Sequence, residues 1–173
     1  MDDRESPGGP ASTARWSALR SAVPVLLRLA LGTAFLSAVA DRLGFWGPPG
    51  AGGVAWGEFS AFLDYTATLN PWAPEALIPW IGWAATVAEV VLGLALLMGL
   101  FTRRAALAAG VLLGLFGLGM TVGTGVKSAL DASVFSASAA ALALAILGPG
   151  PMSVDRMRRS LPAPTPTGEG GPS

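Results

Sequence analysis

The chain has 173 residues, of which 52% are hydrophobic and only 13% are charged. A soluble domain of this length needs a more polar surface, and the apolar content excludes disorder of the body of the chain. Basic and acidic residues number 11 each, so nothing indicates nucleic-acid binding. Because Cys and His are both absent, thiol chemistry, imidazole catalysis and the usual zinc, iron–sulfur and haem ligands are excluded. We therefore expect no metal site, no catalytic residue and no independent catalysis.

The N-terminal part of the chain predicts a polar tail followed by a membrane span. Residues 1–14 are polar and contain prolines and glycines, so we predict a disordered tail. An apolar run over residues 23–43 predicts the first span, and Pro24 is tolerated in its first turn. The small residues at positions 37–40 resemble a signal-peptide cleavage site. The acidic N-terminus and Arg28 inside the run favour a retained span instead.

A long connection over residues 41–76 is predicted to contain one short helix. The stretch 47–53 consists of Gly, Pro and Ala and cannot form regular structure. Apolar side chains then recur at steps of three and four, which is typical of one helix face, at Trp56, Phe59, Phe62, Leu63 and Thr66. This helix is too short to span a bilayer. We expect it to lie flat on the membrane surface or over the mouth of the bundle.

The rest of the chain predicts three further spans and a tail. The spans cover residues 77–101, 105–125 and 130–147, and the last of them is short. Residues 153–173 are first basic and then rich in Pro and Gly, which predicts a second disordered tail. The predicted fold class is therefore all-α. It is a four-helix transmembrane bundle over residues 15–152, with a short extracytoplasmic amphipathic helix between spans one and two.

The distribution of charge predicts the orientation of the bundle. Eight of the 11 basic residues lie in the two tails and in the link between spans two and three. Since basic residues stay on the cytoplasmic side, we expect both termini to be cytoplasmic, in a bacterial-type plasma (inner) membrane. Five of the six Trp residues lie at the opposite boundary, and we interpret them as an interfacial belt rather than a binding feature. They are Trp46, Trp56, Trp72, Trp80 and Trp83.

Two groups of charged residues form the candidate site. Arg28 and Glu89 lie inside the first and second spans, where each charge costs roughly 2.5–3.5 kcal/mol unless it is paired or faces a cavity. Their expected depths allow an ion pair. At the outer end, Asp41 is expected to pair with Lys127, or Lys127 with Asp131. Two interpretations stay open: packing alone, or a polar pocket for a lipid-soluble ligand or a proton path. Glu89 is the stronger functional candidate, because a buried carboxylate can exchange a proton near neutral pH and Arg cannot.

Three segments of the chain resemble the DoxX family of small four-span integral membrane proteins. They read LRLALG at residues 27–32, AEVVLG at 88–93 continuing to GLFTR at 99–103, and GVK at 125–127 followed by SVFSAS at 133–138. The resemblance covers about residues 23–148. It implies the four-span fold and an association with quinone-reactive sulfur oxidation or other bacterial redox complexes. The family offers no established catalytic residues, so Arg28, Glu89, Lys127 and Asp131 match its polar pattern and not a proven site.

The resemblance and the buried charges favour one function and leave two alternatives. We expect an accessory or anchor subunit of a quinone-linked membrane oxidoreductase, with a quinone as ligand and lipid as surroundings. The alternatives are a small transporter or permeability factor and a purely structural scaffold built on small-residue stripes. Gly110 and Gly114 have GxxxG spacing. We interpret this motif as packing inside the bundle rather than as the interface of a homo-oligomer.

Overall fold

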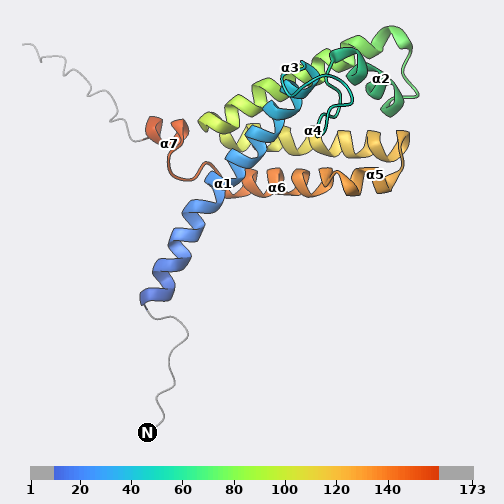
Figure 1. Cartoon of the computed structure of the whole chain (residues 1–173). Coiled ribbons are helices and arrows are strands. Elements are labelled where there is room, and N and C mark those ends of the chain that lie inside the picture. The colour runs from blue at the N-terminus through green and yellow to red at the C-terminus, as the bar shows by residue number, and fades with distance from the viewer. Residues whose placement is uncertain (1–9, 160–173) are drawn as a thin grey trace, which may run out of the picture.

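A computed structural model describes residues 10–159 of the chain (Figure 1). Within these residues all regular elements are helices, and no strand is present. In chain order they are α1 (Pro10–Arg42), α2 (Phe59–Leu69), the 3-10 helix η1 (Glu75–Leu77), α3 (Ile78–Met98), α4 (Thr102–Gly123), α5 (Val126–Asp131), α6 (Val134–Leu147) and α7 (Val154–Arg159). The predicted all-α class is confirmed, and so is the short helix, here α2, between the first two long apolar helices.

Three helices are long and apolar enough to cross a membrane, within Ser12–Arg42, Glu75–Met98 and Thr102–Gly123. Helix α6 is apolar but has only 14 residues, which is about 21 Å of helix against a hydrocarbon core of about 30 Å. The continuous helix predicted over residues 130–147 is wrong. The chain turns between α5 and α6, where Ser133 adopts the left-handed φ of 54°, and one such residue interrupts an α-helix.

Helix α1 has 33 residues and is therefore about 50 Å long. It runs obliquely along the bundle, and its N-terminal part stands clear of the other helices (Figure 1), so residues 13–23 are exposed. The predicted disordered tail is wrong for residues 10–14, which form the start of this helix. Pro10 suits the first helical turn, and no helix breaker follows it before Pro24. Residues 1–9 lie outside the described residues.

Glycines set the closest approaches between the long helices. Helix α1 packs against α3 where Gly32 meets Gly93, since a Cβ on Gly32 would lie 3.0 Å from the carbonyl oxygen of Gly93. Helix α4 packs against α6, where a Cβ on Gly110 would lie 2.7 Å from the Leu142 side chain. The Ser138 hydroxyl also donates a hydrogen bond of 2.7 Å to the carbonyl of Gly110. Gly110 is thus used inside the bundle, as we expected from its GxxxG motif.

The apolar core lies toward the end of the bundle that carries α7 and the link between α3 and α4. Its buried members come from α1, α3, α4 and α6 and are Leu31, Phe35, Leu96, Ala105, Ala106, Ala109, Ala141 and Leu144. Five of them have no exposed surface at all. We call this part of the molecule, in which Leu96, Ala106 and Leu144 have no exposed surface, the closed end.

Helix α2 lies across the opposite end, which we call the α2 end. Its Leu63 sits on Gly82 of α3, where a Cβ would come within 2.5 Å of the leucine side chain. Its C-terminal Leu69 packs on Gly119 and Gly123 of α4. The helix therefore packs across α3 and α4 and covers this end of the bundle. Of the two predicted positions for this helix, the one over the mouth of the bundle is confirmed.

The chain after α6 returns to the closed end and is ordered there. Ser153 is buried, and the carboxylate of Asp155 in α7 accepts backbone N–H bonds from Phe101 and Thr102, each 2.8 Å long. These bonds satisfy free donors at the start of α4. The predicted disordered tail over 153–173 is therefore wrong for residues 153–159. The rest of that tail, 160–173, lies outside the described residues.

Candidate functional site

The buried carboxylate of Glu89 forms an ion pair with Arg42, at the last residue of α1. The distance between Arg42 Nη2 and Glu89 Oε2 is 2.8 Å, and both residues are about 2% exposed. Arg42 Nη1 also donates a hydrogen bond of 2.9 Å to the hydroxyl of Thr86. Thr86 in turn donates to the carbonyl of Gly82, one turn earlier in α3. The two formal charges compensate each other, so the buried pair is neutral.

The predicted ion pair between Arg28 and Glu89 is wrong. Around the contact of Gly32 with Gly93, Arg28 lies four residues to one side and Glu89 four residues to the other, which separates their Cα atoms by roughly 12 Å along the axis. The directions of the side chains separate them further. Side chains tilt toward the N-terminus of their own helix, and α1 and α3 are antiparallel. Arg28 and Glu89 therefore diverge, whereas Arg42 and Glu89 point toward each other.

Arg28 instead binds backbone carbonyls of α3 and of the chain after α6 at the closed end. Its guanidinium donates to the carbonyls of Leu96 at 2.8 Å and Leu97 at 2.9 Å, at the C-terminal turn of α3. It also donates to the carbonyls of Pro149 at 3.1 Å and Met152 at 3.4 Å. A cation at a helix C-terminus compensates the free carbonyls and the helix dipole. Arg28 is thus a structural residue that fixes α1, α3 and the chain after α6 to one another.

Gly99 makes room for this guanidinium. It ends α3 with a φ of 68°, which is favourable only for glycine. A Cβ at this position would also lie 2.6 Å from Arg28 Nη2 and 2.6 Å from the Ser153 side chain. The glycine therefore serves both the turn and the close approach of the arginine.

The other three predicted site residues lie apart from the buried pair. Asp41 accepts backbone N–H bonds from Ala55, Trp56 and Gly57, at 2.8 to 3.1 Å, and so fixes the loop between α1 and α2. Lys127 pairs with Asp131, four residues later, in an exposed salt bridge. Of the two pairs predicted for Lys127, the one with Asp131 is confirmed and the one with Asp41 is wrong.

Aromatic rings cover Arg42 from the α2 side. The guanidinium carbon lies 3.8 Å from the ring centroid of Phe62 and 5.3 Å from that of Trp56, within the range of a cation–π contact. Trp56 also contacts the rings of Phe62 and Tyr65, with centroids 5.3 Å and 6.2 Å apart. The loop held by Asp41 positions Trp56, so Asp41 supports the site indirectly.

A cavity of about 860 Å³ lies beneath α2 and reaches the Arg42–Glu89 pair. Its walls come from α1, α2, α3, α4 and α6, with Ala132 from the turn before α6. Most of its lining is apolar, including Leu31, Phe35, Leu113, Phe116, Met120 and Val134. Polar groups from α2, among them Tyr65, Thr66 and Asn70, line it as well. A large apolar pocket with a few polar groups is the usual form of a small-molecule site.

One polar atom beside this cavity lacks a partner. Arg42 Nε is buried and makes no hydrogen bond, although the other nitrogens of the same guanidinium bind Glu89 and Thr86. A buried donor without an acceptor costs free energy. A ligand oxygen that reaches Arg42 would remove that cost. The arrangement can therefore bind a neutral acceptor group.

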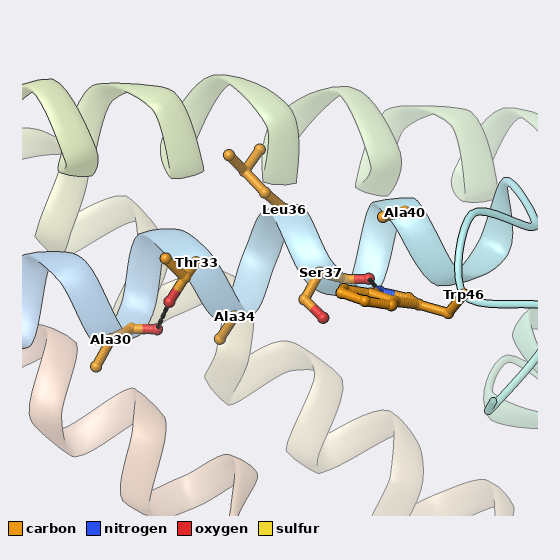
Figure 2. Close-up of a pocket in the computed structure, with 7 residues that line it drawn as sticks. All are labelled: Ala30, Thr33, Ala34, Leu36, Ser37, Ala40 and Trp46. Carbon is orange, nitrogen blue, oxygen red and sulfur yellow. Dashed lines mark hydrogen bonds between the residues drawn. The ribbon is translucent and has the colours of Figure 1, made fainter. Parts of the chain in front are cut away.

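A second hollow, of about 600 Å³, lies on the outer side of α1 (Figure 2). It is lined mainly by small side chains, and Trp46 closes one end of it. The indole N–H of Trp46 donates to the carbonyl of Ser37 at 3.1 Å, and Thr33 donates to the carbonyls of Leu29 and Ala30. The indole of Trp46 and the hydroxyl of Thr33 are thus satisfied within α1 and its loop. Ala34 lines both this hollow and the cavity.

The sequence interpretation missed the residues that complete the site, namely Arg42, Thr86, Trp56, Phe62 and Tyr65. Trp56 was assigned to the interfacial belt, and the other four Trp residues of that group are indeed exposed. The tilt of helical side chains toward the N-terminus of their own helix could have indicated the Arg42–Glu89 pair, because in antiparallel helices it directs these two side chains toward each other.

Comparison of this chain with family models, with curated proteins and with solved structures gives no match. The resemblance to the DoxX family therefore stays a prediction from the quoted segments.

Proposed function

We propose that this chain is a DoxX-like integral membrane protein that binds a lipid-soluble quinone in the cavity under α2. In this proposal it serves as an accessory or anchor subunit of a quinone-linked redox complex and performs no catalysis by itself. The observation that carries the proposal is the apolar cavity of about 860 Å³ that ends at a buried, internally neutralised ion pair. A neutral ring with a hydrocarbon tail fits such a space better than a charged metabolite does.

The residues suggest separate roles toward such a ligand. The unpartnered Nε of Arg42 would donate to a carbonyl oxygen of the ring. Trp56, Phe62 and Tyr65 offer aromatic faces beside that guanidinium, against which a flat ring stacks. The apolar wall formed by Leu31, Phe35 and Leu113 would receive the tail. When bound, a quinone supplies the capacity to accept and release electrons, which this chain lacks.

The membrane arrangement is part of the proposal. Helices α5 and α6 together would form the fourth span, and the closed end would face the cytoplasm of a bacterial-type plasma membrane with both termini. The concentration of arginines at that end supports this orientation. An alkaline phosphatase fused to the C-terminus tests it, because that enzyme is active only outside the cytoplasm. Activity of the fusion would contradict the orientation.

Quinone binding is tested by extraction of the purified protein. The chain is isolated in a mild detergent, its lipids are extracted, and quinones are quantified by mass spectrometry. The variant Arg42→Gln/Glu89→Gln removes both charges; it keeps the side-chain size at position 89 and shortens the side chain at position 42. We expect its quinone content to fall about tenfold, because a hydrogen bond to a charged group contributes about 1.5–3 kcal/mol. The matched control Lys127→Gln/Asp131→Asn removes the exposed pair and should retain quinone.

The result that would overturn the proposal is equally definite. If the wild-type protein carries no quinone and copurifies with no oxidoreductase, the chain is not a quinone-linked subunit.

The transporter alternative has less support. Permeation needs access from both sides, and the fully buried side chains of the closed end lie between the cavity and that end of the bundle. Equal flux in liposomes with wild type and with Glu89→Gln would remove it.

A further inference from the structure

The rim of the cavity under α2 has two chemically different sides. On α2 the exposed lining residues are the polar Asp64 and Thr68, and the loop before α2 adds the exposed Ala55. The opposite side carries Ala34 of α1 and Ala132, just before α6, which are both exposed and apolar. Exposed residues that line a cavity mark its opening. The opening therefore lies between α1, α2 and the start of α6. Its edge on α2 is polar, and its edge on α1 and before α6 is apolar.

The apolar edge continues along the length of the helices. On α1 the lining runs from Arg42 through Ala38 to Ala34 and Leu31, a stripe of about 16 Å at 1.5 Å per residue. On the other side, Val134 and Ala137 line it from α6. The stripe reaches the surface at Ala34, whereas Leu31 and Arg42 at its two ends are buried. Helix α1 is long and apolar enough to cross a membrane, and across such a span Ala34 would face hydrocarbon and not water.

Helix α1 moves away from α6 toward the α2 end (Figure 1), and residues of both helices line the cavity there. Leu31 and Phe35 of α1 belong to the same buried apolar cluster as Ala141 and Leu144 of α6, toward the closed end. Small side chains of the two helices line the cavity, namely Ala34, Ala38 and Ala137. Small side chains leave space for a passing chain of methylene groups, whereas larger ones would fill the gap.

We infer that this opening is a lateral entrance from the lipid phase, and that the ligand is an amphiphile that reaches the cavity from the bilayer and not from water. Its hydrocarbon part passes between Ala34 and Ala137, and its polar part follows the α2 edge toward Arg42 and Glu89. The identity of the occupant rests on the proposed function. The route of access does not, because it follows from the lining residues alone.

Because the chain has no cysteine, single thiols can report access without removal of native groups. Ala85→Cys places a thiol in the cavity lining of α3, one turn before Glu89. Ser60→Cys places the control thiol on the exposed face of α2, outside the cavity. Both variants are reconstituted in phosphatidylcholine vesicles and treated with a lipophilic pyrene maleimide or with a sulfonated maleimide. The labelling rates are measured by fluorescence or mass.

We expect the cavity thiol to react with the lipophilic reagent and to be protected from the sulfonated one, since an apolar passage excludes a charged group. Relative to the Ser60→Cys control, the preference for the lipophilic reagent should be at least about tenfold, equivalent to a difference of about 1.4 kcal/mol in the activation free energy. Equal relative rates with both reagents would overturn the inference, because they would show an aqueous mouth.

A plug at the entrance completes the test. Ala34 and Thr33 are both exposed neighbours on α1, and they leave the helix in different directions (Figure 2). Added to Ala85→Cys, Ala34→Trp should slow lipophilic labelling about tenfold, while Thr33→Trp, which lies outside the cavity lining, should leave it unchanged. Ala132→Trp blocks the other side of the same opening and replaces Ala34→Trp if that variant does not fold. Equal labelling with plug and control would place the entrance elsewhere and overturn the inference.

These measurements separate the two proposals. The labelling experiment uses no quinone, so it can fail while quinone is still recovered from the purified protein. Conversely, the lateral labelling pattern with no recovered quinone would remove the proposed function and leave the lipid-phase entrance in place.

Discussion

The two buried arginines of α1 show how differently the two ends of the molecule use the same residue type. At the closed end, Arg28 donates to four backbone carbonyls and lies among fully buried side chains. At the α2 end, Arg42 pairs with Glu89, lies under aromatic rings and keeps one donor unpartnered beside a cavity. A guanidinium that is fully used by backbone groups stabilises the fold. One that is partly used and faces a space can bind a ligand.

The largest effect on stability is expected from Arg28→Ala. It removes one buried and three partly buried hydrogen bonds to backbone carbonyls and opens a void, so we expect a loss of about 4 kcal/mol in the free energy of unfolding. Arg28→Lys should restore only part of it, because one ammonium group lacks the planar fork of five donors. Reversible unfolding by SDS in mixed micelles measures both variants. A loss below about 1 kcal/mol for Arg28→Ala would contradict the structural role of Arg28 at the closed end.

A smaller effect is expected from Asp41→Asn. The carboxylate accepts three backbone N–H groups, and an amide offers one acceptor oxygen in place of two. We expect a loss of about 1–2 kcal/mol, confined to the loop that places Trp56. Hydrogen exchange at residues 55–57 should accelerate, while exchange in α4 and α6 stays unchanged. The neighbouring exposed variant Glu58→Gln is the control and should alter neither; uniform acceleration across the chain would contradict a local role.

The smallest effect is expected from Lys127→Ala. The side chains of Lys127 and Asp131 are 86% and 64% exposed, so water and salt screen their interaction. We expect a loss below about 0.5 kcal/mol in the same unfolding assay. A loss comparable to that of Arg28→Ala would mean that the exposed pair, and not the closed end, holds the bundle together.

Periodicity was sufficient to predict the three long apolar helices and the short helix α2 in outline. On α1, Gly32, Phe35 and Val39 follow Arg28 at steps of three and four, and all three are buried. The predicted stripe of the short helix is confirmed for Phe62 and Thr66, which are buried, whereas Trp56 lies in the loop before α2. These features depend on 3.6 residues per turn, which a sequence displays directly.

The partners of the charged residues could not be predicted in the same way. The pairing of Glu89 depends on the level at which α1 and α3 cross and on the directions of the side chains. The expected depths of Arg28 and Glu89 in their spans contain neither of these two quantities. The loop at 43–58 has no periodicity, so the contact of Asp41 with residues 55–57 was not visible. The break before α6 depends on a single left-handed residue, Ser133.

The central claim is that Glu89 belongs to Arg42 at the cavity and not to Arg28, and a double-mutant cycle tests it most directly. Unfolding free energies are measured for Arg42→Ala, Arg28→Ala and Glu89→Ala and for the two double variants that contain Glu89→Ala. We predict a coupling of at least about 1 kcal/mol between Arg42 and Glu89, and losses for Arg28 and Glu89 that add within about 0.5 kcal/mol. Coupling of Glu89 to Arg28, with additivity for Arg42, would contradict the account.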